Sequence, residues 1–134
     1  MAEFVMKELV RQAGLEHEFL IESAATSREE IGNDIHYGTR QKLLEQHIPF
    51  SCRAARQITR ADYDKYDWLV AMDDENIFYM KRCWNPDPEH KIVHLLSFAG
   101  KPRDIADPWY TGNFDETYND VLEGCEAFIK FLNL

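Results

Sequence analysis

The sequence has 134 residues, of which 45% are apolar, 13% aromatic and 29% charged, a composition typical of one globular domain. With 15 Lys and Arg against 24 Asp and Glu, its formal net charge is -9, so the average field repels phosphate backbones and anionic lipid. We therefore expect neither a nucleic acid nor a membrane surface as a partner. The longest apolar run, residues 68–72, is far shorter than the ~20 residues that a membrane span needs.

The first residues mix acids into apolar positions, whereas a secretory signal has a basic start and an uninterrupted apolar core. This pattern predicts a cytoplasmic protein. Its three cysteines, Cys52, Cys83 and Cys125, are odd in number and form no Cys-x-x-Cys, so we expect reduced thiols.

Apolar residues recur with helical spacing from residue 2 to residue 13, and Gly14 is placed to end this first helix. A helix N-terminus normally follows a capping residue, which pairs the free N–H groups. Nothing precedes Met1, so we expect that a segment is missing upstream.

The middle of the sequence alternates short strands with short helices. Residues 19–21 are predicted to form a strand that runs into a polar loop, and residues 39–47 a helix. Thr59 is expected to cap a helical turn through Tyr63. Residues 68–72 do not alternate in polarity, which predicts a strand buried on both faces.

The second half of the sequence continues the alternation. Asp73 is expected to cap a helix over residues 74–83, and residues 91–96 are predicted to form another strand. Residues 99–113 form a long loop of the kind that often carries function. Asn113 is expected to cap a final amphipathic helix. Together these elements predict an α/β domain, with a parallel sheet covered by helices on both faces.

The histidines were considered as metal ligands. His90 and His94 are four apart, but the residues between them are typical of a strand, which separates the two side chains by about 13 Å, too far to share one zinc. His17, His36 and His47 have no second ligand nearby in the sequence. We therefore expect no metal and no other cofactor.

The long loop holds the most distinctive group of side chains, Asp107 followed by Pro108, Trp109 and Tyr110. An acid against aromatic walls can have its protonated form favoured by desolvation, which suits a general acid. Composition alone favours the alternative, an Asx-type turn with two packing aromatic residues.

Five stretches, in order along the chain, resemble the low-molecular-weight protein tyrosine phosphatases: residues 1–5, 23–27 together with 30–33, 55–59, 71–76 and 107–112. Each stretch is a weak match alone, but in this order they cover essentially the whole chain. The resemblance implies one domain of this family over residues 1–134.

The family resemblance implies a parallel four-stranded sheet and a Cys-x5-Arg phosphate loop, in which the Cys attacks phosphorus and the Arg clamps the phosphate oxygens. Asp107 corresponds to the family's general acid, which protonates the leaving phenolate and then acts as base toward water. Trp109 and Tyr110 resemble the aromatic wall for a phosphotyrosine ring, and Tyr37 resembles the residue on the facing wall.

The sequence departs from the family at its start. In the family the Cys-x5-Arg loop immediately precedes the stretch at which this chain begins. The positions six residues after the three cysteines hold Ile58, Glu89 and Phe131, so none of them is in a Cys-x5-Arg. We expect an N-terminally truncated domain that lacks its first, central strand, its nucleophile and its phosphate loop, and a polypeptide that is itself inactive.

Two other functions stay open. One is a non-catalytic interaction module, a pseudophosphatase that keeps the aromatic surface. The other, ranked last, is a related arsenate reductase, which uses additional cysteines for redox relay. That activity would require a second cysteine a few residues from Cys83, and the sequence has none there.

The partners follow from the resemblance and from the expected truncation. In its full-length form, the protein is expected to act on a phosphotyrosine protein or a small aryl phosphate. In this chain, loss of a central strand between residues 19–22 and 68–72 would expose two rows of unpaired backbone groups. We expect these two edges to pair with each other, or a second copy to supply a strand in an exchanged homodimer.

Overall fold

The computed structural model describes residues 1–26, 37–51, 56–84, 87–101, 103–106 and 112–132. The α-helices are α1 (Ala2–Gln12), α2 (Tyr37–Glu45), α3 (Ala61–Lys65), α4 (Asp74–Cys83) and α6 (Phe114–Leu132). The 3-10 helices are η1 (Glu16–Glu18) and η2 (Leu95–Ala99), and the strands are β1 (Leu69–Ala71) and β2 (Ile92–His94). No helix within the described ranges is both long and apolar enough to cross a membrane.

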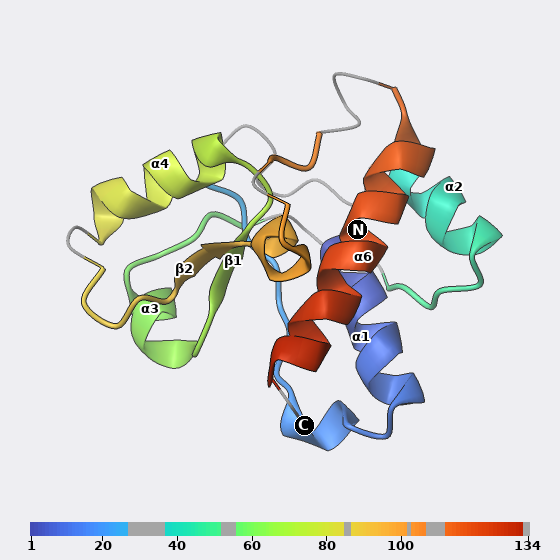
Figure 1. Cartoon of the computed structure of the whole chain (residues 1–134), viewed down its shortest axis with the longest axis horizontal. Helices are drawn as coiled ribbons and strands as arrows, with labels where there is room; N and C mark the ends of the chain where they lie inside the picture. Colours follow the sequence, from blue (N-terminus) through green and yellow to red (C-terminus); the bar gives the residue numbers. More distant parts are fainter. Residues whose placement is uncertain (27–36, 52–55, 85–86, 102, 107–111, 133–134) are drawn as a thin grey trace.

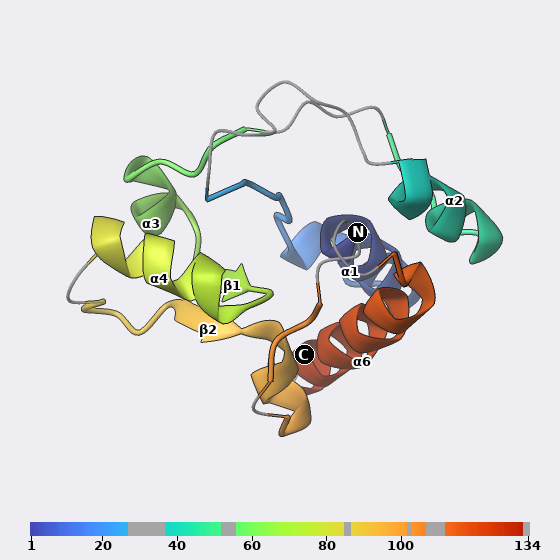
Figure 2. The same cartoon turned by 90° about the horizontal axis from the view of Figure 1, so that it is seen from above.

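The two strands form a parallel sheet, with Leu69 opposite Ile92 and Ala71 opposite His94. Figure 1 shows α3 and α4 beside the strands in one half of the molecule, and α1, α2 and α6 in the other half. The view turned by 90° in Figure 2 shows the same division, with the sheet between α4 and α6.

Side chains of β1 enter two separate cores, because neighbouring residues of a strand point to opposite faces. Leu69 and Ala71 pack with Met80 of α4, whereas Val70 packs against the cluster formed by α1 and α6. The expectation of a parallel sheet with helices on both faces is therefore confirmed for these two strands.

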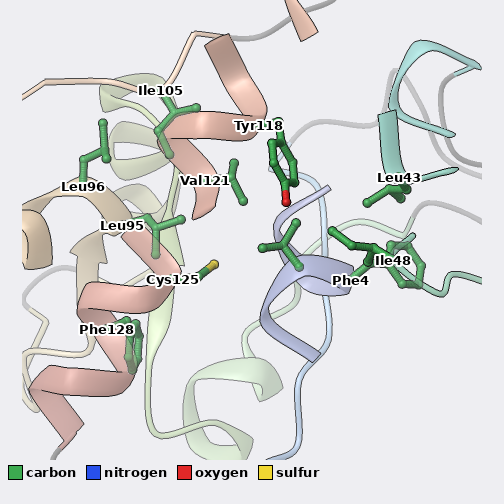
Figure 3. Close-up of a cluster of buried hydrophobic side chains, with 11 residues drawn as sticks. Phe4, Leu43, Ile48, Leu95, Leu96, Ile105, Tyr118, Val121, Cys125 and Phe128 are labelled. Carbon is green, nitrogen blue, oxygen red and sulfur yellow. The ribbon is translucent and has the colours of Figure 1, made fainter. Parts of the chain in front are cut away.

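The larger core lies between α6, α1 and η2, and Figure 3 shows its side chains pointing toward one another. Its buried members are Phe4, Val5, Leu43, Ile48, Leu95, Leu96, Ile105, Tyr118, Val121, Cys125 and Phe128. Rings of Trp68, Phe98 and Phe128 pack edge to face or tilted beside it, with centroids 4.4–6.1 Å apart. The amphipathic final helix predicted from residue 114 is the element that joins these groups.

Several predicted elements are confirmed. The first helix ends where predicted, with Gly14 in the left-handed region at a φ of 73°. The helix over residues 74–83 has the predicted bounds, and its N-cap Asp73 accepts a hydrogen bond from the backbone N–H of Asn76 at 2.8 Å. Helix α2 begins two residues earlier than predicted.

The predicted strand over residues 19–21 is wrong. These residues are irregular, and the segment forms only an isolated parallel bridge further on, where Ala25 pairs with Gln57. Its apolar side chains Phe19 and Ile21 are half-buried and line a cavity together with Phe4 of α1. The expected pairing of this segment with residues 68–72 is therefore also wrong, since β1 pairs only with β2 among the described residues.

The strand predicted over residues 91–96 is shorter than expected, because β2 ends at His94 and the chain turns into η2. Leu95 and Leu96 are buried under α6 as 3-10 residues. A short apolar run predicts burial, but it does not distinguish a buried strand from a buried helical turn.

Thr59 does not cap α3 as predicted. The helix begins at Ala61, and its N-cap Arg60 makes no side-chain capping bond. Instead, the carboxylate of Asp62 accepts hydrogen bonds from the backbone N–H of Thr59 at 2.7 Å and from the Arg56 guanidinium at 3.0 and 3.2 Å. Asp62 thus organises the turn from inside the helix.

Gly124 allows α6 to approach η2 closely. A Cβ at this position would lie 2.6 Å from Cγ of the buried Leu95. We expect Gly124→Ala to lower the free energy of unfolding by about 1–3 kcal/mol, the usual cost of overpacking, although alanine is the better helix former. Urea unfolding measures this change.

The matched control is Asn119→Ala, at an exposed position of the same helix, which we expect to leave stability nearly unchanged or slightly raised. Equal or higher stability of Gly124→Ala than of this control would contradict the close packing of α6 on η2.

Candidate active site

The predicted general acid Asp107 and the aromatic residues Trp109 and Tyr110 lie outside the described residues. Tyr37, the predicted facing wall, is the first residue of α2 and is 73% exposed. The structure describes both flanks of the segment 107–111 and the elements that hold them.

The flank that precedes this segment is fixed to β1 and to α6. Ile105 is buried, and its backbone N–H donates to the carbonyl of Met72 at 2.9 Å. The carbonyl of Ala106 accepts a hydrogen bond from the Thr117 hydroxyl at 2.9 Å. The position of the chain is therefore fixed up to the residue before Asp107.

An ion pair adds a further anchor to the same flank. The guanidinium of Arg103 donates two hydrogen bonds to the carboxylate of Asp120 in α6, at 2.9 and 2.8 Å. Because Arg103 donates to it, the pKa of Asp120 lies below its ordinary value of 3.8. Asp120 is buried while Arg103 is half exposed, so α6 supplies the buried member of this ion pair.

The flank that follows the segment is fixed at the first turn of the same helix. Asn113 confirms the predicted cap, since its side-chain oxygen accepts from the backbone N–H of Glu116 at 3.0 Å. Gly112 has a φ of 70°, in the left-handed region that glycine adopts readily. Thr117, which holds Ala106, also donates to the carbonyl of Asn113 at 3.3 Å. One helical turn thus holds both ends of residues 107–111.

Helix α2 brings Tyr37 to the same end of α6. A Cβ on Gly38 would lie 2.2 Å from a ring atom of Phe114, so α2 packs directly against the first residue of α6. Lys42 also forms an ion pair with Asp115 of that helix. The exposed Tyr37 ring is therefore carried on a helix that is fixed to the turn that holds residues 107–111.

The carboxyl end of β1 is organised by Asn76. Its side-chain oxygen accepts from the backbone N–H of Met72 at 3.2 Å, and its amide donates to the Thr26 hydroxyl at 3.5 Å. Three chain segments therefore meet where β1 ends, the edge of a parallel sheet at which α/β proteins bind ligands.

The residues that hold the flanks of segment 107–111 and the end of β1, here called the frame, were not predicted from the sequence. Arg103 and Asp120 are 17 positions apart, and neither belongs to a local motif. Asn76 lies in a stretch that resembles the family, but nothing in the sequence shows that its side chain joins three segments. Only the capping roles of Asp73 and Asn113 have a local signal, a short polar residue directly before a helix.

Comparison with known proteins identifies the family of this chain. Residues 1–134 match the model of the low molecular weight phosphotyrosine protein phosphatase family. The chain belongs to this family. The resemblance of its five stretches is thereby confirmed.

Individual relatives agree with this assignment. The chain is 34% identical to the low molecular weight protein-tyrosine-phosphatase YfkJ of Bacillus subtilis, over 96% of this chain and 84% of the relative. It is 32% identical to the corresponding enzyme PtpA of Staphylococcus aureus, over 98% of this chain and 84% of the relative.

Solved structures confirm the family fold. The crystal structure of YfkJ superposes with a TM-score of 0.94 at 33% identity, covering 98% of this chain and 84% of that chain. The low molecular weight protein tyrosine phosphatase of Streptococcus pyogenes superposes with a TM-score of 0.86 at 35% identity, covering 98% and 82%. The described elements therefore keep the spatial arrangement of the family.

The ion pair that anchors the flank before Asp107 predicts a defined pH dependence. Because the native pKa of Asp120 is lowered, the pair's contribution is fully present above pH 3.8 and is lost as the pH falls through the native pKa. We expect Arg103→Gln to lower the free energy of unfolding at pH 7, and the difference from wild type to shrink as the pH falls. Urea unfolding at a series of pH values measures this.

Arg60→Gln, a change of the same kind at an exposed position outside this pair, is the control. A difference between Arg103→Gln and wild type that stays constant as the pH falls well below 3.8 would contradict the pH dependence expected of this ion pair.

Proposed function

We propose that this chain carries the general-acid loop and the aromatic walls of a protein tyrosine phosphatase, which hydrolyses phosphotyrosine through a cysteinyl-phosphate intermediate. The observation that supports it most is the family match over all 134 residues. The proposed substrates are a phosphotyrosine protein or a small aryl phosphate, and the relatives carry the corresponding name, protein-tyrosine-phosphatase.

In this proposal Asp107 donates a proton to the phenolate as it leaves phosphorus, and then accepts a proton from the water that hydrolyses the intermediate. Trp109 and Tyr110 form one wall for the substrate ring, and Tyr37 faces them. Support comes from the frame, since one turn of α6 holds both flanks of residues 107–111 and contacts the helix that carries Tyr37. Catalysis by a general acid needs such fixed positioning.

The cysteines described by the structure do not supply the nucleophile. Cys125 is buried in the core, which raises the pKa of its thiol to about 12 and keeps it neutral at physiological pH. Cys83 is exposed on α4, but Glu89 stands where a Cys-x5-Arg would place the arginine. We propose that the nucleophile and its arginine come from residues outside these 134.

The sequence alternative of a pseudophosphatase rests on the same observation, that residues 1–134 contain no Cys-x5-Arg. As a binding module, the chain would use the aromatic walls to hold a phosphotyrosine ring without cleaving it. Activity measurements on the 134-residue polypeptide and on a longer one distinguish the two functions.

The 134-residue polypeptide is expected to show no hydrolysis of para-nitrophenyl phosphate above the uncatalysed rate, because the covalent step has no nucleophile. Phosphate release during prolonged incubation is the measurement. Turnover that persisted through purification and was abolished by Asp107→Ala would contradict the proposal.

A polypeptide extended at its N-terminus by a strand and a Cys-x5-Arg loop tests the role of Asp107. We expect Asp107→Ala to slow hydrolysis of aryl phosphates with poor leaving groups more than those with good ones, because a stable phenolate needs little protonation. General-acid catalysis is typically worth about 100- to 10,000-fold, which sets the expected loss for poor leaving groups. The measurement is kcat/KM across a series of substituted phenyl phosphates.

Asp64→Asn, at an exposed position of α3, is the control and is expected to leave both classes of substrate unaffected. Equal losses for poor and good leaving groups in Asp107→Ala would remove Asp107 from the general-acid role.

We also propose that a second copy of the chain can cover the open edge of β1. Leu69 uses its backbone N–H toward β2, bonding to the carbonyl of Lys91 at 2.9 Å, so the alternation of a parallel ladder turns the N–H and C=O of Val70 to the other edge. No strand within the described ranges pairs there. An exposed strand edge is a template for pairing with another chain.

Light scattering after size exclusion tests this association, and we expect a concentration-dependent species of twice the 15.8 kDa chain mass. Val70→Pro removes the N–H at the open edge and is expected to weaken dimerisation. A strict monomer at all concentrations would contradict the proposed pairing of a second copy at the open edge of β1.

A further inference from the structure

Three side chains of metal-ligating type meet where the two strands end, and each comes from a different segment. His94 is the last residue of β2, Asp74 is the first residue of α4, and Asp104 lies between η2 and α6. One ligand atom from each lies within 4.8 Å of the other two. His94 Nε2 is 2.9 Å from Asp74 Oδ1 and 3.7 Å from Asp104 Oδ1.

We propose that Asp74, His94 and Asp104 bind one divalent transition-metal cation. A tetrahedral Zn²⁺ with ligands at about 2.0–2.1 Å holds neighbouring ligand atoms about 3.3–3.4 Å apart. The two separations from His94 Nε2 lie on either side of this value, and the two carboxylate oxygens lie within 4.8 Å of each other. Rotation of the two aspartate side chains would bring the three ligand atoms to these spacings. Water completes the coordination, because both carboxylates reach the surface.

The chemistry of the three ligands selects the class of cation. An imidazole nitrogen with two carboxylate oxygens suits Zn²⁺ and its first-row neighbours, whereas Ca²⁺ and Mg²⁺ prefer oxygen ligands alone. For a given set of such ligands the affinity for Zn²⁺ exceeds that for Mn²⁺. We therefore expect Zn²⁺ to bind more tightly than Mn²⁺, and Mg²⁺ to bind least.

The local charge also favours a cation. Neither Asp74 nor Asp104 has a lysine or arginine ion-pair partner in the part of the chain that the structure describes. The nearby Arg103 guanidinium is bound to Asp120, and it reaches Asp104 only at the backbone carbonyl, at 3.3 Å. The two carboxylates therefore present a double negative charge to His94.

The positive end of the α4 dipole opposes a cation here, but carboxylates already occupy two of its backbone donors. Asp73 accepts from the N–H of Asn76 at 2.8 Å, and Asp104 accepts from the N–H of Asp74 at 3.0 Å. The second of these bonds also holds Asp104 beside Asp74, so the helix end orients a ligand. The carboxylates of the two proposed ligands, Asp74 and Asp104, keep further lone pairs for a metal.

Metal binding requires the lone pair of His94 Nε2, so the proton through which Nε2 bonds to Asp74 must first leave that nitrogen. A neutral imidazole provides it when its proton resides on Nδ1, and a protonated imidazole releases one proton to solvent for each cation bound. The hydrogen bond between His94 and Asp74 is then replaced by two metal–ligand bonds. Binding does not depend on the proposed phosphatase function, since no catalytic residue takes part.

Isothermal titration with ZnCl2 on the purified chain tests the site, in a Cys83→Ser background that removes the exposed one of the two cysteines that the structure describes. We expect one Zn²⁺ per chain and a higher Tm with Zn²⁺ present. His94→Gln and Asp104→Asn are each expected to weaken binding at least about tenfold and to abolish the Tm increase, as the loss of a ligand does. His17→Gln and Asp64→Asn, exposed residues outside the cluster, are the matched controls and should bind as the background does.

Far-UV circular dichroism verifies that each variant is folded, and Asp74→Asn replaces any variant that is not, since it keeps the backbone N–H bonded to Asp104. Absence of a one-to-one binding event would overturn the proposal. Equal Zn²⁺ affinity in the folded ligand variants and in the background would overturn it too, as would an equal loss in His17→Gln.

Discussion

The packing of α6 on η2 and α1 is the constraint on which the rest of the structure depends. The helix contributes Tyr118, Val121, Cys125 and Phe128 to the larger core, and its contact with η2 is close because residue 124 has no side chain. With only two short strands in the described sheet, most of the apolar burial in the larger core comes from helix packing. The position of α6 therefore fixes the positions of the elements around it.

The same helix connects the core to the candidate active site. Its first turn holds both flanks of residues 107–111, and its middle carries the acid that pairs with Arg103. The opposite end of α6 packs its aromatic side chains around Trp68, next to β1. A disturbance of α6 in the core would consequently move the segment that carries the proposed general acid.

Local patterns in the sequence predicted the elements whose signals are local. The helical spacing before Gly14, the polar caps Asp73 and Asn113, and the apolar stripe of the last helix each need only a few neighbouring residues to be recognised. The strand predicted over residues 19–21 failed because a short apolar run does not by itself distinguish a paired strand from an irregular segment that lines a cavity beside α1.

Contacts between residues that lie far apart in the sequence could not be predicted from local patterns. Arg103 meets Asp120, and Thr117 meets Ala106, because the fold packs the chain that follows η2 against α6. The sequence places His94 four residues from His90, whereas the structure brings it to Asp74 and Asp104 instead. The roles of Asp107, Trp109 and Tyr110 follow from family resemblance and stay predictions.

Hydrogen exchange followed by mass spectrometry tests most directly whether α6 is the element on which the fold depends. Amides over residues 121–128 of α6 are predicted to exchange only through global unfolding, with protection equal to the total stability measured by urea, while η1 and α2 exchange faster. If α6 exchanged as fast as α2, while the strands β1 and β2 stayed protected, the central role of this helix would be contradicted.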